Sequence, residues 1–172
     1  VVLTEKLNTV TLVKALSVEA TLDFILKHPD EFPANLHIAY NSVTEIVKAI
    51  ERAGITDCNI YCANDKDNKN MEKLGEYEKF YVEQPNETNF KKINFYTCKY
   101  FEGWDMYDEN ATLILVTNIH REHTKVGIAD KGVQFFGRLR GKKGTDEAAK
   151  PFQLIHVTNC HYECATPTGS II

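Results

Sequence analysis

Apolar residues along this chain fall into short runs, separated by segments in which apolar positions recur at helical spacing. This alternation is typical of βαβ units arranged around a largely parallel sheet. It predicts a single α/β domain in which no internal repeat is visible. The strands are predicted near residues 10–15, 36–40, 59–62, 79–82, 93–97, 112–117 and 152–158.

The clearest helical signal covers residues 43–53. Ser42 and Glu45 form a capping box at its start, and Gly54 provides a stop after it. The apolar positions fall on one helix face, which predicts that the helix packs against the sheet. These positions are Val43, Ile46, Val47 and Ile50.

Two further helices are predicted from weaker signals. One covers residues 19–27 and is ended by the proline that follows it. The other covers residues 131–139, with Asp130 as its N-cap and with Val133 and Phe136 facing inward. Two polar stretches, 64–73 and 104–111, are predicted to be surface loops, and 141–151 is predicted to be a loop or a hairpin.

Length and composition narrow the class of protein. With 172 residues, of which 43% are hydrophobic, the chain suits one well-buried domain. No apolar run approaches the roughly 20 residues that cross a bilayer, and the N-terminus does not look like a signal peptide. We therefore expect a soluble, cytoplasmic protein with no membrane partner. Because the chain begins at Val1 without a methionine, we also expect it to be part of a longer protein.

The formal net charge of −4 argues against a generic cationic nucleic-acid binder, because nonspecific binding depends on Lys and Arg side chains that neutralise phosphates. Charge can still be concentrated locally. The densest basic cluster consists of Arg138, Arg140, Lys142 and Lys143.

Part of this cluster belongs to a distinctive segment, residues 134–140. Gln134 and Arg138 are four positions apart and share a helix face, while Gly137 lacks a side chain that would block a partner's approach. A planar guanidinium can bind phosphate oxygens in a bidentate manner. The alternative interpretation is an amphipathic helix whose arginines face solvent.

A second distinctive segment lies upstream. The apolar run 93–97 ends in Thr97, and the loop after it carries Gly103 and Asp105. If the run is a strand, it leads to a hydroxyl, an exposed backbone and a carboxylate at the carboxyl edge of a sheet. Ligands bind at that edge in open α/β folds.

Together these segments resemble superfamily 2 helicases. Residues 95–97 with 102–105 look like motif V, and residues 134–140 look like motif VI. Residues 36–42 look like motif IV, and the three occur in the family's order. The Gln-x-x-Gly-Arg-x-Arg spacing is closest to viral-type origin-binding and replication helicases, which fits a replication protein of a phage or mobile element.

The resemblance implies the C-terminal RecA-like domain of a helicase or translocase, a three-layer α/β fold with a mainly parallel sheet and no P-loop of its own. Such a domain supplies half of an ATP site. By resemblance, Arg138 and Arg140 would reach the γ-phosphate in the transition state, and Gln134 would sense it. The implied ATP contacts are Gly103, Asp105 and Gly137.

The resemblance also implies a nucleic-acid surface at Asn41, Ser42 and Thr97, with DNA expected rather than RNA. For Asn41 and Ser42 the residues themselves support this, because free amides and polar side chains at a helix N-terminus bind anions. Contacts there would position a sugar-phosphate strand without reading its sequence. For Ser42, a purely structural helix cap is at least as good an interpretation.

Other apparent motifs lack required parts. Residues 141–145 imitate a phosphate loop, but Phe136 stands where that loop needs a glycine. Residues 146–149 imitate an acidic magnesium motif without a preceding apolar strand. We therefore expect ATP and Mg²⁺ to bind only together with an N-terminal RecA-like lobe. No metal site is expected within the chain, and Cys58 and Cys62 are interpreted as buried thiols.

Two rival functions remain at this point. The chain could be a noncatalytic α/β module that binds nucleic acid or protein and keeps only the helicase-like fold. It could also belong to an unrelated nucleotide-binding enzyme with a doubly wound sheet.

Overall fold

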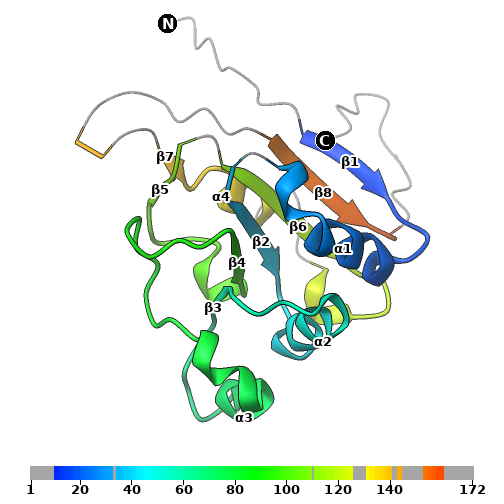
Figure 1. Ribbon diagram of the computed structural model, residues 1–172, viewed down its shortest axis with the longest axis horizontal. Coiled ribbons are helices and arrows are strands. Elements are labelled where there is room, and N and C mark those ends of the chain that lie inside the picture. Colours follow the sequence, from blue (N-terminus) through cyan, green and yellow to red (C-terminus); the bar gives the residue numbers. More distant parts are fainter. Residues whose placement is uncertain are drawn as a thin grey trace, which may run out of the picture.

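The computed structural model describes residues 10–32, 34–109, 111–125, 131–140, 143–144 and 153–160. Figure 1 shows a central sheet flanked by helices. Six strands lie in the order β1-β8-β6-β2-β4-β3, and every pairing between them is parallel. The strands are β1 (Val10–Lys14), β2 (Leu36–Tyr40), β3 (Asn59–Tyr61), β4 (Ile93–Tyr96), β6 (Thr112–Thr117) and β8 (Gln153–Thr158).

One face of the sheet is covered by α1 (Val18–Lys27) and α2 (Val43–Ala53), together with α3 (Asn70–Leu74) and the 3₁₀ helix η2 (Gly75–Phe80). Alternate strand residues such as Ile38 pack against this layer and form the larger hydrophobic core. The alternation follows from the two-residue period of a strand, which sends successive side chains to opposite faces.

The opposite face carries shorter elements. They are α4 (Val133–Phe136), the 3₁₀ helix η3 (Cys98–Tyr100), and a small second sheet in which β5 (Met106–Tyr107) pairs in parallel with β7 (Leu139–Arg140). Phe135 is fully buried and packs in the second hydrophobic core of the molecule. The predicted α/β fold with a mainly parallel sheet in three layers, as in RecA-like domains, is therefore confirmed.

Local sequence signals explain where α2 begins and ends. The Ser42 hydroxyl accepts a hydrogen bond from the Glu45 amide, so it caps the helix N-terminus. Gly54 ends the helix at φ +66°, a left-handed conformation that glycine adopts at little cost. Two further 3₁₀ turns occur, η1 (Pro29–Glu31) and η4 (Glu122–Thr124).

Several predicted elements differ from the structure. The strand predicted at 79–82 is wrong, because residues 75–80 form η2, and only a single bridge joins Tyr81 to Ile60 of β3. The loop predicted at 64–73 contains the start of α3, and the loop predicted at 104–111 contains β5.

The third predicted helix is also shorter than expected. Gly137 caps α4, and the chain then leaves as β7 instead of continuing to residue 139. Val133 was expected to face inward but is 50% exposed, because Phe135 occupies the core position. Asp130 and residues 141–142, 145–152 and 161–172 lie outside the described residues. None of the helices described is long and apolar enough to span a bilayer.

Candidate functional site

A cleft opens at the carboxyl ends of β2, β3, β4 and β6, the end of the sheet nearest α2 and α3 in Figure 1. Its volume is about 870 Å³. The loops that follow these strands line it, and among the lining residues are Asn41, Ser42, Thr97, Lys99, Arg121 and His123. The three residues expected to bind nucleic acid therefore lie in one cleft.

The floor of this cleft includes the N-terminus of α2. Val43 and Thr44 line it, and the first amides of an α-helix have no acceptor within the helix. The Glu45 amide donates a hydrogen bond to the Ser42 hydroxyl, so Ser42 does cap the helix, as the structural interpretation expected. A helix N-terminus also carries a partial positive charge, which favours anions in the cleft.

Asn41 uses its side chain to join two loops. Its amide nitrogen donates to the carbonyl of His123 at 2.7 Å, and its amide oxygen accepts from the backbone amide of Cys98 at 3.0 Å. The loop after β4 is thereby tied to the loop after β6. Asn41 shapes the cleft, whatever further contact its remaining donor makes.

Thr97 directly follows the last residue of β4. Its backbone amide donates to the carbonyl of Tyr61, and the residue is 7% exposed. Within the described part of the chain, the hydroxyl forms no hydrogen bond, although Thr97 lines the cleft. A polar group in this setting is available to a ligand.

A buried carboxylate lies beside the cleft. Glu45 accepts from Lys48 Nζ at 3.1 Å and from Arg121 Nε at 3.0 Å, and its side chain is 5% exposed. Burial acts to raise the pKa of Glu45, but the hydrogen bonds from Lys48 and Arg121 outweigh it and lower the pKa. Glu45 is therefore held as an anion between two cations.

The residues expected to contact ATP form a second cluster, on the sheet face that carries α4, β5 and β7. Arg140 Nε lies 2.9 Å from Asp105 Oδ1, and the Met106 amide donates to the Arg138 carbonyl at 2.9 Å. Arg138 Nε donates to the carbonyl of Gln134, one helical turn earlier. The segments that resemble motifs V and VI are thus hydrogen-bonded to each other.

The two glycines of this cluster have local roles. Gly103 has φ +84°, a conformation that L side chains rarely adopt, and it turns the loop away from the sheet edge. A Cβ at Gly137 would lie 3.0 Å from the Val133 carbonyl, which accepts a hydrogen bond from the Gly137 amide. A side chain at Gly137 would therefore crowd the end of α4.

Asp105 was expected at the same sheet edge as Thr97, but it does not line the cleft. After Gly103 the chain runs back across the sheet face to pair with β7, and Asp108 reaches Asn35 and His37 at the start of β2. Figure 1 shows β5 and β7 toward the end of the sheet opposite α2 and α3. Lys131 and Glu102, which both line the cleft, form an ion pair with each other.

A buried histidine that sequence reasoning did not single out holds the second cluster in place. His37 is fully buried, with Nε2 2.7 Å from Asp108 Oδ2 and Nδ1 2.8 Å from the Tyr96 hydroxyl. Burial lowers its pKa, although Asp108 partly offsets this, so the ring is neutral. The sequence did contain a signal for this residue, because His37 stands inside an otherwise apolar predicted strand.

No protein-family model, curated protein or solved structure matches this chain. Within the described residues, no group of three or more His, Cys, Asp or Glu side chains could hold a metal ion. Cys58 and Cys62 are buried free thiols, as interpreted from the sequence.

Proposed function

We propose that this chain is the second motor lobe of an ATP-dependent nucleic-acid helicase or translocase, in which ATP and Mg²⁺ bind between it and an N-terminal RecA-like lobe. One observation carries the proposal: the segments that resemble motifs V and VI, widely separated in sequence, contact each other through the Arg140–Asp105 ion pair and the β5–β7 pairing. A nucleotide-facing surface built from two motifs requires this contact.

The surroundings of the two arginines favour Arg138 as the group that reaches the γ-phosphate. Arg140 is bound to the carboxylate of Asp105 and also donates to the Gly137 carbonyl. Arg138 forms no ion pair within the described residues, and its Nε bond to Gln134 leaves the other end of the guanidinium open. We therefore assign Arg140 to holding the second cluster together and Arg138 to the phosphate.

The chemistry that Arg138 would supply is electrostatic. A guanidinium placed beside the phosphoryl group in transfer stabilises charge that develops in the transition state, an effect worth about 10³-fold or more in rate. Gln134 lies in α4, its carbonyl accepts a hydrogen bond from Arg138, and it would respond to the same phosphate. Gly103, Asp105 and Gly137 would support this surface by shaping its backbone and anchoring Arg140.

The cleft on the opposite side of the motif V segment would hold the nucleic-acid strand. Asn41, Ser42 and Thr97 would face its sugar-phosphate backbone, with DNA the proposed partner. Coupling would then run through the motif V segment, because it contributes Thr97 to the cleft and Asp105 to the arginine surface. Closure of the two lobes on ATP would shift this segment between two states.

The proposal is tested by steady-state ATP hydrolysis of the full-length protein with single-stranded DNA present. Arg138→Ala should reduce kcat by roughly 10³-fold. Arg138→Lys should also lose most of the activity, because lysine keeps the charge without the planar fork. Arg52→Ala is the matched control, since Arg52 pairs with Asp23 between α1 and α2 and should leave kcat unchanged.

Unchanged turnover in Arg138→Ala would reject Arg138 as the finger. Absence of ATP hydrolysis in the wild-type protein, with DNA binding retained, would instead favour the noncatalytic binding module.

A further inference from the structure

The loop after β6 contributes a cation to the cleft that no motif assigns. Arg121 lies in that loop and lines the cleft together with Thr97 and the N-terminus of α2. Its side chain is 40% exposed, whereas that of its partner Glu45 is 5% exposed. The guanidinium therefore pairs with a buried carboxylate while part of the Arg121 side chain stays exposed.

The ion pair with Glu45 leaves most N–H donors of the Arg121 guanidinium without a hydrogen bond among the described residues. Arginine has five N–H donors, of which Nε is bound to Glu45 and one at Nη1 to the carbonyl of His120 at 3.2 Å. The remaining donors have no partner within the described residues. Glu45 fixes one edge of the planar group, which reduces the entropy lost when the free edge binds a ligand.

The charged residues that line the cleft are more often basic than acidic. The basic ones are Lys73, Lys99, Arg121 and Lys131, and the acidic ones are Glu45, Asp65 and Glu102. Of these, Lys99 is an exposed cation on the neighbouring loop. The whole chain, by contrast, has 20 Lys and Arg against 24 Asp and Glu. The lining of the cleft therefore has a formal net charge of +1, whereas the whole chain has −4.

An independent feature points to the same kind of ligand. Thr97, which is almost fully buried, lines the cleft, and its hydroxyl has no partner among the described residues. The free amides at Val43 and Thr44 supply further donors. Hydrogen-bond donors and a fixed guanidinium around one space are the groups that bind a phosphate.

We propose that Arg121, oriented by the buried carboxylate of Glu45, binds a backbone phosphate of a single nucleic-acid strand in this cleft. The inference rests on the proposed function and adds to it a residue outside motifs IV, V and VI. It also assigns Asn41 to joining the loops that carry Thr97 and Arg121, since its amide bridges them.

The test is the binding of a labelled single-stranded oligothymidine to the full-length protein, followed by fluorescence anisotropy across a range of salt concentrations. Arg121→Gln should weaken binding about tenfold, as expected for loss of a charged hydrogen bond. The slope of log affinity against log salt should become shallower by about 0.7, the value for one phosphate contact on a single strand. Arg121→Lys should keep the slope and lose part of the affinity.

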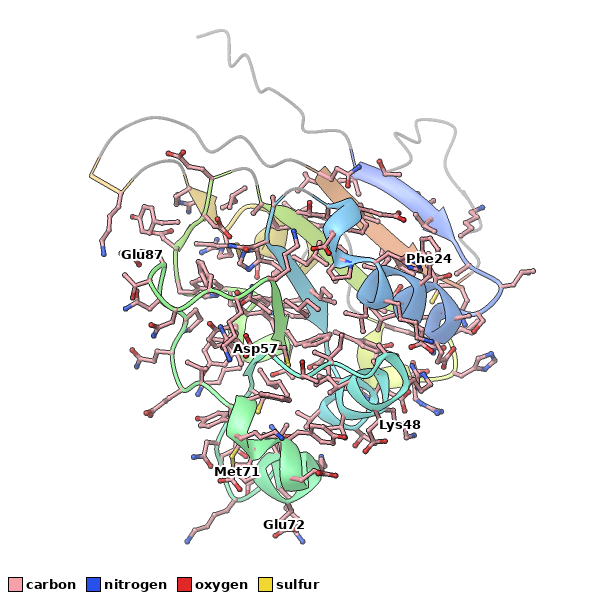
Figure 2. The ribbon with its side chains drawn as sticks, viewed as in Figure 1. Phe24, Lys48, Asp57, Met71, Glu72 and Glu87 are labelled. Carbon is pink, nitrogen blue, oxygen red and sulfur yellow. The ribbon has the colours of Figure 1, made fainter. Side chains whose placement is uncertain are left out.

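Lys48→Gln is the matched control. Lys48 pairs with the same carboxylate but projects from α2 without lining the cleft (Figure 2). Its loss should leave both affinity and slope unchanged. Thermal melting of each variant verifies that it is folded.

The outcomes distinguish failure of the Arg121 inference from failure of the proposed motor function. Equal weakening by Arg121→Gln and Lys48→Gln would overturn the inference, because the cause would then be an unpaired Glu45. Wild-type affinity and slope in a folded Arg121→Gln protein would overturn it as well, while leaving the motor function intact. A wild-type protein that binds no oligothymidine even at low salt would overturn both.

Discussion

At the scale of single residues, three arginines have different environments. Arg140 is held by Asp105, Arg121 is held by Glu45, and Arg138 has only a backbone carbonyl as its partner among the described residues. An arginine that is already paired on one edge is oriented but still has donors to offer. Carboxylates such as Asp105 and Glu45 therefore determine the direction in which these cations act.

Asp108 has a structural role that stability measurements can isolate. Asp108→Ala removes the acceptor of the buried His37 Nε2–H, which should lower the free energy of unfolding by about 1–3 kcal/mol. Asp108→Asn keeps an acceptor oxygen and should cost less. Urea denaturation of the three proteins measures both effects. Equal stability of wild type and Asp108→Ala would show that the hydrogen bond is unimportant.

At the scale of secondary-structure elements, α2 is the best defined by its own residues. Ser42 begins it, Gly54 ends it, and the helix places Glu45 beside Arg121 and its first amides in the cleft. The pairing of β5 with β7 is the opposite case, since two residues on each side cannot form a stable sheet alone. Packing of Phe135 and the Asp105–Arg140 ion pair support it from both sides.

Gly54→Ala tests the end of α2. The residue has φ +66°, and a Cβ added there would have no atom within 4 Å, so the cost comes from backbone conformation alone. We expect the free energy of unfolding to fall by about 1 kcal/mol. Gly54→Asn should cost less, because asparagine tolerates this conformation better. A loss well above this value, seen in thermal melts, would indicate a packing role that the structure does not show.

At the scale of the whole molecule, two candidate surfaces lie at different places on one parallel sheet. The cleft lies at the carboxyl ends of the strands, and the arginine surface lies on the face that carries α4, β5 and β7. The segment from Thr97 to Asp108 runs from one to the other, and His37 anchors its far end in the sheet. This continuity is the physical basis for the proposed coupling of strand binding to nucleotide binding.

Stability of the molecule should decline in mildly acidic solution. Burial lowers the pKa of His37 and lowers that of His156 to about 4, from an ordinary value of 6.5. The unfolded state therefore binds protons more tightly, so the free energy of unfolding should fall as pH drops from about 6.5 to about 4. For His156 the loss should reach roughly 3 kcal/mol at the lower end.

Chemical denaturation at a series of pH values measures this decline. His156→Gln should flatten the profile in that window, because it removes the group with the lowered pKa. A His156→Gln protein with the wild-type slope would contradict the assignment.

The sequence by itself determined the features that depend on near neighbours. The strands β2 and β6 and the helix α2 occupy the predicted ranges, because apolar periodicity and capping residues act within a few positions. The resemblance assigned Asn41, Ser42 and Thr97 to one nucleic-acid surface. They line one cleft, since the carboxyl ends of parallel strands meet there.

Only the tertiary structure decided the rest. Arg121 and Glu45 are 76 positions apart, and nothing local to either residue indicates the other. The direction of α4 was likewise set by the fit of Phe135 into the second core, which left Val133 outside. Contacts between distant segments depend on how the layers pack, and a one-turn helix or a two-residue strand has too few residues to signal its own place.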